Sequence, residues 1–372
     1  MNSGRILFLG LSYHKKTGSS GFIENLLEER FEVTKIYEQS WINKELATDY
    51  SSIPLGDYDA IIIWQIAYLL PDDFLRKLGK LNTVFFPMEN YWDEWAVWNK
   101  YRKFKIISFS RYNYEKLKKW GFDVEYFQFY PKPNFVPFAS GKEKFTVFFW
   151  QRVNAITWKE IKQLFNKDQI EKIILHNSVD PFNDFTMPSE ADIRDYNIEI
   201  TEWFDRKSDL EEKIAQADIY ISPRLTEGIG FSFLEAMAMG KAVVAMNAPT
   251  MSEYIVHNKN GYLFNVFDIK KLDLTDIDKI RMECVSDVES GFRKWTKDKE
   301  RIFEIIERDY NPNRELLNRQ KRVGVIRVIV HKLRKLLRGL VPAIFMIVYR
   351  RYIKRDLMRI YAKRNRQDHY RN

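Results

Sequence analysis

The sequence has almost no cysteine, since Cys284 is the only one among 372 residues. A single cysteine excludes an intramolecular disulfide framework and a zinc site built from cysteine thiolates, and it fits a reducing compartment. No run of 18 apolar residues is present, so we expect no ordinary transmembrane helix. The apolar run 6–9 is too short for the core of a signal peptide, and we expect a first buried strand there and no leader.

Patterns typical of a metal or dinucleotide site are also scarce. Asp57-Tyr58-Asp59 gives a D-x-D pattern, but it precedes an apolar segment rather than following one, so we interpret it as a solvated turn. No other group of His, Asp and Glu has the spacing of a metal site, and the glycine pattern G-x-G-x-x-G is absent. We therefore expect no metal and no cofactor.

Positive charge is concentrated at the C-terminus. Residues 314–372 hold 18 Lys and Arg against three Asp and Glu, a surplus of 15 within a total net charge of +9, so residues 1–313 carry −6. In this tail the basic residues alternate with apolar ones, a pattern typical of a helix that lies on a membrane surface. Nucleic-acid binding is the less favoured alternative, and residues 295–308 fit a closing helix that packs on the first domain.

Short apolar runs alternate with amphipathic stretches, which predicts parallel sheets covered by helices on both faces. We expect helices near 112–120, 158–165, 210–217 and 232–239. The expected strands are 5–10, 60–64, 83–87, 106–108 and 124–127, followed by 146–150, 172–176, 198–201, 219–222 and 242–246.

Three prolines among polar and small residues mark a linker at 131–143. Each side of the linker has enough strands for a doubly wound sheet. We therefore predict an α/β protein of two Rossmann-like domains, 1–135 and 136–310, that face each other across a cleft, with a basic helical tail at 311–372. Ligands of such sheets bind at the carboxyl ends of the strands.

The most informative segment is 219–261. A predicted strand ends at Ser222, a loop carries Glu227, Gly228 and Gly230, and a helix starts near Phe231 or Ser232 and stops at Gly240. Glycines allow a close approach of the backbone to a ligand, and the N-terminus of a helix favours a phosphate group. A carboxylate at this place suits sugar hydroxyls rather than the phosphate.

Glu235 has two interpretations that the spacing alone leaves open. It lies about one turn into the helix, where it could accept hydrogen bonds from a ribose diol, as acidic residues do in dinucleotide sites. Ser232-x-x-Glu235 also fits a capping box, in which Glu235 serves only the helix terminus.

The whole segment resembles the retaining glycosyltransferases of the GT-B fold, especially family four, whose hallmark is two glutamates in the spacing E-x7-E. Here the pattern is Pro223-Arg-Leu-Thr-Glu227-Gly-Ile-Gly-Phe-Ser-Phe-Leu-Glu235-Ala-Met-Ala-Met-Gly240. The resemblance implies that Glu227 lies against the donor sugar and that Glu235 binds the ribose. It also implies that the loop and helix start hold sugar hydroxyls and diphosphate, through residues Gly228, Ile229, Gly230, Phe231 and Ser232.

The same resemblance implies a cationic clamp for the diphosphate, formed by an Arg and a Lys after the first strand of the second domain. Arg152 and Lys159 match by order, although the spacing is one residue longer and Gln151 replaces a glycine. Guanidinium groups bind phosphate oxygens in a bidentate manner, and the two cations could stabilise a departing diphosphate. The alternative is a solvated helix start.

On the acceptor side, a turn rich in Gly and Ser follows the first strand and contains His14. This histidine is either a group that faces the acceptor or simply solvated. The resemblance implies a histidine after the strand expected at 83–87, but none is present here, and Glu89 or Asn90 could occupy that place.

The resemblance implies a retaining transferase of the hexosyltransferase type, and the lack of a metal pattern predicts that it is metal-independent. We expect it to move a sugar from a nucleotide-diphosphate donor to a lipid-linked or cell-surface glycan acceptor, in polysaccharide or lipopolysaccharide biosynthesis. The tail, residues 320–372, would hold it on anionic lipid at the cytoplasmic face of a membrane. The alternatives are a GT-B enzyme that is not a transferase, such as a nucleotide-sugar epimerase or a sugar phosphorylase, and a silent membrane-bound scaffold.

Overall fold

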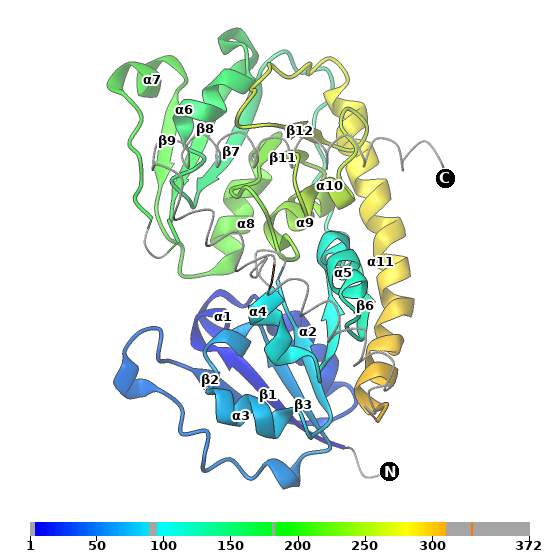
Figure 1. Cartoon of the computed structure of the whole chain (residues 1–372). Helices are drawn as coiled ribbons and strands as arrows, with labels where there is room; N and C mark the ends of the chain where they lie inside the picture. The colour runs from blue at the N-terminus through cyan, green and yellow to red at the C-terminus, as the bar shows by residue number, and fades with distance from the viewer. Residues whose placement is uncertain (1–3, 89–94, 181–182, 310–328, 330–372) are drawn as a thin grey trace. The chain divides into compact units, whose positions relative to one another are not determined.

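The computed structural model describes residues 4–88, 95–180, 183–309 and 329, and it divides into two compact units (Figure 1). Unit 2 is Gln128–Thr296, and unit 1 contains the residues before it together with those from Lys297 onwards. The boundary predicted after residue 135 therefore falls within unit 2. The chain has also returned to unit 1 before residue 310, where the second domain was expected to end.

Unit 1 is built on a six-stranded parallel sheet in the order β2-β1-β3-β4-β5-β6. Its strands are β1 (Arg5–Leu11), β2 (Glu32–Glu38), β3 (Ala60–Trp64), β4 (Thr83–Phe86), β5 (Lys105–Ser108) and β6 (Val124–Tyr126). Its helices are α1 (Ser12–Thr17), α2 (Gly21–Glu28), α3 (Asp72–Leu78), α4 (Trp95–Trp98) and α5 (Arg111–Lys119).

Strands in the middle of this sheet are continuous apolar runs because helices cover both of their faces. All five residues of β3 are buried, and Ile6–Leu9 of β1 have no exposed surface. The edge strand β2 is different: its sequence, EVTKIYE, mixes charged and apolar residues, and most of its side chains are only half-buried. This mixed pattern explains why the sequence did not predict β2.

Unit 2 contains a second parallel sheet, in the order β12-β11-β10-β7-β8-β9. Its strands are β7 (Phe145–Gln151), β8 (Ile170–Asn177), β9 (Ile198–Thr201), β10 (Ile219–Ile221), β11 (Ala242–Met246) and β12 (Tyr262–Phe264). Its helices are α6 (Trp158–Ile161), α7 (Glu190–Asp195), α8 (Lys207–Ala215), α9 (Phe231–Ala238), α10 (Met251–Tyr254) and the start of α11 (Ile277–Glu307). The ten predicted strands are all present, and among the strands that the structure describes only β2 and β12 were missed.

A buried ion pair fixes the turn between α9 and β11. Arg281 of α11 is 1% exposed, and its Nη1 donates to Oδ1 of Asp218 over 3.0 Å. Its Nε donates to the carbonyl of Gly240 over 2.9 Å. Gly240 has a φ of +72°, the left-handed conformation expected where the helix ends. Pairing and hydrogen bonding are what make a buried guanidinium tolerable.

The C-terminal end of α11 packs within unit 1, as expected for a closing helix on the first domain. The rings of Phe303 and Phe31 lie 5.8 Å apart. Lys105 of β5 has no exposed surface, and its Nζ donates to the carbonyls of Ile305 over 2.6 Å and Ile306 over 3.2 Å, and to the carbonyl of Arg308. This lysine satisfies carbonyls that a helix C-terminus leaves without internal partners.

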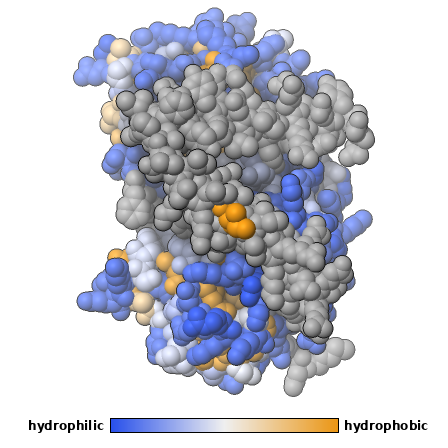
Figure 2. Space-filling model, viewed as in Figure 1, coloured by the Kyte–Doolittle hydropathy of each residue, from blue (hydrophilic) through white to orange (hydrophobic). Residues whose placement is uncertain are grey.

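Hydrophilic side chains cover much of the described surface on the face drawn in Figure 2, with scattered apolar side chains among them. Within the described ranges, no helix has the length and apolar character needed to cross a membrane. The predicted membrane-binding tail, residues 320–372, lies outside the described residues except for Ile329.

We expect the stability of unit 1 to depend on the ionisation of Lys105. Burial, followed by the charge of Arg308, lowers the pKa of Lys105 from 10.5 to about 8, against the opposing charges of Asp123 and Asp309. A lowered lysine pKa contributes stability that is present above pH 10.5 and is lost as the pH falls to about 8.

Unfolding temperatures measured from pH 7 to 10.5 should therefore fall faster with decreasing pH in the wild type than in Lys105→Met. The exposed neighbour change Lys103→Met is the control and should follow the wild type. Parallel pH profiles for wild type and Lys105→Met would contradict this account.

Candidate active site at the carboxyl edge of the second sheet

The segment around Glu227 joins β10 to α9 at the carboxyl edge of the sheet in unit 2. Gly230 precedes the helix with φ +86° and ψ +42°, a left-handed conformation that favours glycine. A Cβ at Gly230 would lie 1.9 Å from the ring of Phe233, so a side chain does not fit there. The helix begins at Phe231, as the sequence predicts, and Ile229 is 2% exposed.

The structure decides between the two interpretations of Glu235. The residue at the helix cap is Gly230, and no side chain caps the helix. Glu235 instead points to Lys207 of α8, whose Nζ lies 2.5 Å from Oε1. The capping-box alternative is therefore wrong. The side chain of Glu235 is 38% exposed, so this carboxylate remains accessible to a ligand.

The backbone of Glu227 is held from the loop that follows β11. The amide of Glu227 donates to the carbonyl of Pro249 over 3.2 Å. The hydroxyl of Thr250 donates to the carbonyls of Glu227 over 2.8 Å and Gly228 over 3.2 Å. Thr250 is fully buried. Sequence reasoning missed this residue, because a single threonine in a loop carries no distinctive pattern.

The Glu227 side chain is half-buried in a charged neighbourhood. Burial raises its pKa above the ordinary 4.5, the charges of Arg224 and Arg152 act in the opposite direction, and the charge of Asp180 adds to the effect of burial. No hydrogen bond or ion pair to this carboxylate occurs among the described residues. A half-buried acid with a raised pKa and no protein partner is typical of a functional site.

Two arginines and one aspartate lie together near this glutamate. Arg152, directly after β7, donates from Nε and Nη2 to Oδ1 of Asp180 over 2.9 and 2.6 Å. Arg224, in the loop after β10, donates from Nη2 to Oδ2 of the same carboxylate. Asp180 follows β8. Because β10, β7 and β8 are neighbours in a parallel sheet, their carboxyl ends bring these three residues to one edge.

Sequence reasoning found Arg152 but missed Arg224 and Asp180. Arg224 stands three residues before Glu227, just outside the E-x7-E pair, and a basic residue next to that pair was a usable signal. Asp180 comes from a loop without any motif, and only the folded sheet brings it to the arginines.

Hydrogen bonds join the loop after β7 to the loop after β8. The amide of Asn154 donates to Oδ1 of Asn183 over 3.1 Å, and the amide of Asp184 donates to Oδ1 of Asn154 over 2.9 Å. Gln151, which replaces the glycine of the family pattern, is buried, and its Nε2 donates to the carbonyl of Asp184 over 3.2 Å. The glutamine is therefore part of a brace between the loops.

Lys159 does not join this cluster. It is the second residue of α6 and is exposed, and its ammonium group makes no ion pair or hydrogen bond within the described part of the chain. The turn of α6 begins with a capping box formed by Thr157 and Glu160, so the segment has the character of an ordinary helix start.

Buried polar atoms in the loop that follows β10 have no protein partner among the described residues. They are Oγ of Ser222 and Nε of Arg224. Buried polar atoms in folded proteins are nearly always hydrogen-bonded, so such orphans indicate a place for water or a ligand.

On the acceptor side, the residues after β1 form the short helix α1 rather than an open turn. His14 belongs to this helix and is 8% exposed, so the interpretation of a solvated histidine is wrong. Burial lowers its pKa to about 4, against a hydrogen bond to Gln65 and the charge of Glu24, which keeps the ring neutral at pH 7. Glu89 and Asn90 lie outside the described residues.

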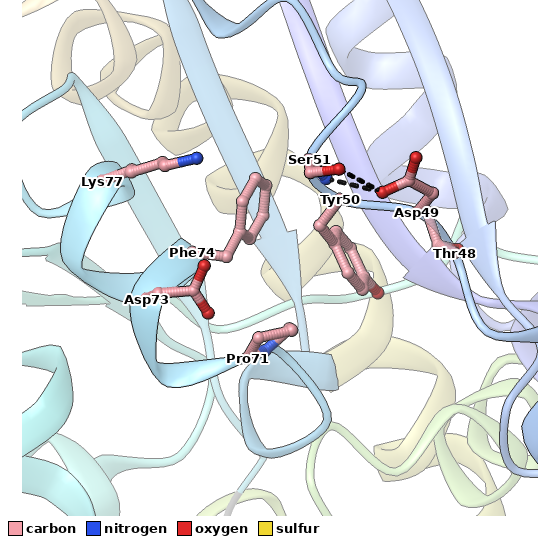
Figure 3. A pocket seen from close by; sticks show the side chains of 8 residues that line it. All are labelled: Thr48, Asp49, Tyr50, Ser51, Pro71, Asp73, Phe74 and Lys77. Carbon is pink, nitrogen blue, oxygen red and sulfur yellow. Dashed lines mark hydrogen bonds between the residues drawn. The ribbon is translucent and has the colours of Figure 1, made fainter.

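A separate pocket lies in unit 1 between α3 and the loop that follows β2. Its volume is about 230 Å³. Figure 3 shows its lining of aromatic, acidic and hydroxyl side chains: Thr48, Asp49, Tyr50, Ser51, Pro71, Asp73, Phe74 and Lys77. The rings of Tyr50 and Phe74 lie 4.8 Å apart. None of the predicted site residues lines this pocket.

The described residues contain no group of three or more His, Cys, Asp and Glu side chains placed to hold a metal ion.

Residues 190–277 match the family model of glycosyl transferases group 1. The matched segment runs from α7 to the first residue of α11 and contains Glu227, α9 and Glu235. The resemblance to glycosyltransferases is therefore confirmed for this segment. No curated protein matches the sequence.

Several solved structures share the fold. HepE of Anabaena, in complex with UDP and glucose, aligns with a TM-score of 0.56 at 15% identity, over 81% of this chain and 98% of its own. Sucrose-phosphate synthase of Thermosynechococcus elongatus gives 0.58 at 13% identity, with coverage of 81% and 98%. The lipopolysaccharide outer core galactosyltransferase WaaB gives 0.50 at 13%, with coverage of 81% and 99%. These likenesses confirm the two-domain GT-B fold.

We expect Glu227 to reduce the stability of the folded protein at neutral pH. A raised carboxyl pKa contributes stability that is fully present below the unfolded value of 4.5 and is lost as the pH rises through the folded value. Glu227→Gln, which cannot ionise, should therefore unfold at a higher temperature than the wild type at pH 7, and the difference should shrink towards pH 4. A lower unfolding temperature for Glu227→Gln at pH 7 would contradict this reasoning.

Gly230→Ala should destabilise the loop and the start of α9. The left-handed φ costs a non-glycine residue about 1–2 kcal/mol, and the contact with Phe233 adds to that cost. We expect the unfolding temperature to fall by roughly 3–8 °C. Gly21→Ala adds the same methyl group where no atom lies within 4 Å and is the matched control. Equal unfolding temperatures for the two variants would contradict this prediction, because they would show that a side chain at Gly230 causes no strain.

Proposed function

We propose that this protein is a retaining glycosyltransferase that moves a sugar from a nucleotide-diphosphate donor to a lipid-linked or cell-surface glycan acceptor. The observation that carries the proposal is the segment from Glu227 to Glu235, which lies within the glycosyl transferases group 1 match at the carboxyl edge of a parallel sheet. Ligands of open α/β sheets bind at this edge.

Each part of the segment has a role in this proposal. Glu227 positions the donor sugar through its hydroxyls, and its lack of a protein partner within the described ranges supports this role. The amides of residues 229–232, with the positive end of the α9 dipole, hold the diphosphate. Glu235, which is half-exposed beside Lys207, accepts hydrogen bonds from the ribose.

The chemistry follows from where charge develops. As the bond between the sugar and the diphosphate breaks, negative charge grows on the leaving phosphate. Arg152 and the helix terminus stabilise this charge, so the chain itself supplies the positive charge that a metal ion supplies in other transferases. In a front-face displacement the leaving phosphate helps to deprotonate the acceptor hydroxyl, and the configuration at the sugar carbon is retained.

The acceptor and the place of action extend the proposal. A basic tail alternating with apolar residues suits the anionic surface of a membrane, where lipid-linked acceptors lie. We therefore place the protein on the cytoplasmic face of a membrane, in polysaccharide or lipopolysaccharide biosynthesis. UDP is the first nucleotide to test, because the structurally similar HepE has been solved with UDP.

Nucleotide binding tests the proposal directly. With UDP, GDP, ADP and CMP in separate samples, one nucleotide should raise the unfolding temperature of the wild type. The rise should be lost in Glu235→Ala and Arg152→Ala. Glu211→Ala is the matched control, since Glu211 also pairs with Lys207, over 3.5 Å, but lies on α8. No shift with any nucleotide, or equal loss in Glu211→Ala, would contradict the proposed site.

Turnover tests the role of Glu227. With the nucleotide sugar whose base binds, Glu227→Ala should release nucleoside diphosphate at least about 100-fold more slowly than the wild type, a typical loss for a group that acts on the transition state. If this variant still binds the nucleotide as tightly as the wild type, the slower turnover comes from the catalytic step and not from weaker binding. Wild-type turnover by Glu227→Ala would rule out its role.

A further inference from the structure

We propose that Arg152 and Arg224 together form a two-arginine clamp for the donor diphosphate, and that Asp180 is a built-in anion which the diphosphate displaces. This inference rests on the proposed function for the identity of the donor. It assigns Arg224, in place of Lys159, as the second cation of the clamp. Asp180 then competes with the diphosphate for the two arginines.

The geometry of the ion pairs carries the proposal. One carboxylate accepts three N–H bonds: two from Arg152 at its Oδ1 and one from Arg224 at its Oδ2. The side chains of both arginines are mostly buried, with 17% and 26% exposed, and that of Asp180 is 13% exposed. Guanidinium groups bind carboxylate and phosphate through the same fork of donors. An anion that links both arginines therefore occupies the position suited to a phosphate group.

The position of this cluster connects it to the donor site. Arg224 lies three residues before Glu227 on the same loop, and the charges of Arg224, Arg152 and Asp180 all act on the Glu227 carboxyl. The same loop leads into the N-terminus of α9, the other element that favours phosphate. Nε of Arg224 is buried without a protein partner in the described part of the chain, so this side chain has a donor left for a ligand.

The backbone of Asp180 is fixed independently of its carboxylate. Its amide donates to the carbonyl of Arg152 over 2.9 Å, and its carbonyl accepts from the amide of Asn183 over 3.1 Å. The bonds between the two loops add to this hold. Release of the carboxylate therefore needs only rotation of the side chain, and the loops can stay in place while anions exchange.

The charges explain how the exchange can run in either direction, depending on whether a diphosphate is present. The two arginines balance Asp180 and Glu227, so the empty site holds no uncompensated positive charge in a partly buried place, where such charge is costly. A diphosphate carries at least two negative charges and competes well against one carboxylate. After sugar transfer, Asp180 forms its ion pairs with the two arginines again as the nucleoside diphosphate leaves. The carboxylate therefore favours product release.

Pyrophosphate is a probe for the clamp that needs neither a base nor a sugar. In titration calorimetry, Asp180→Asn should bind pyrophosphate about 10-fold more tightly than the wild type, because the competing charge is gone while the shape of the side chain stays. Arg224→Gln should bind about 10-fold more weakly. The affinity should also fall steeply with added salt in every variant that retains both arginines.

Two controls match these changes within the same unit. Asp192→Asn removes an acid that pairs with Lys162 over 3.1 Å, and Arg206→Gln removes an arginine that pairs with Asp209 over 2.8 Å. Both should leave pyrophosphate affinity unchanged, because neither residue contacts the clamp. If the control variants changed pyrophosphate affinity as much as the clamp variants do, the effect would come from the net charge of the unit alone. That result would overturn the proposal.

The alternative is that Asp180 is only a structural brace. In that case Asp180→Asn would bind pyrophosphate equally or more weakly, and this result overturns the proposal. If Asp180→Asn does not fold, Arg224→Gln decides, since unchanged affinity in that variant also overturns it.

Nucleotide binding separates this inference from the proposed function. If no nucleotide binds the wild type while pyrophosphate follows the expected pattern, the clamp stands and the transferase proposal fails. If a nucleotide binds with the expected losses in Glu235→Ala, but Asp180→Asn does not tighten pyrophosphate binding, the transferase proposal stands and the built-in anion is refuted.

Discussion

Parallel strand direction is the constraint on which the rest of this structure depends. Because every strand of a sheet runs the same way, all loops that leave the carboxyl ends meet at one edge. In unit 2 this geometry collects Arg224, Arg152 and Asp180 from three neighbouring strands, although they lie far apart in the sequence. The same constraint places Glu227 and the start of α9 beside them. The candidate site is thus a direct consequence of the sheet topology.

The charged groups of the site oppose the stability of the fold. Glu227 is half-buried and has a raised pKa, and two arginines lie close together on a single aspartate. Such groups persist in folded proteins when the surrounding structure holds them, and functional sites commonly carry this cost. Here the holding elements are hydrogen bonds from Thr250 to the Glu227 loop and the brace formed with Gln151.

Much of the fold could be predicted from the sequence, because buried parallel strands are continuous apolar runs between amphipathic stretches. The edge strand β2 escaped because it mixes charged and apolar residues. For the site, the sequence located Arg152 and the Glu227 loop, which stand in a recognisable frame. It could not locate Asp180, which reaches the arginines only through pairing of β7 with β8. The sequence analysis also assigned Lys159 to the clamp, only because it follows Arg152 in the expected order. In the structure Lys159 lies at the exposed start of α6 and has no partner among the described residues.

The most direct test of the account is a crystal structure of the protein with the nucleoside diphosphate that binds it best. We predict phosphate oxygens within about 3 Å of the guanidinium groups of Arg152 and Arg224 and of the first amides of α9. The ribose should lie on Glu235, and the carboxylate of Asp180 should be turned away from both arginines. A nucleotide bound at another place, or Asp180 still bridging the two arginines beside a bound diphosphate, would contradict the account.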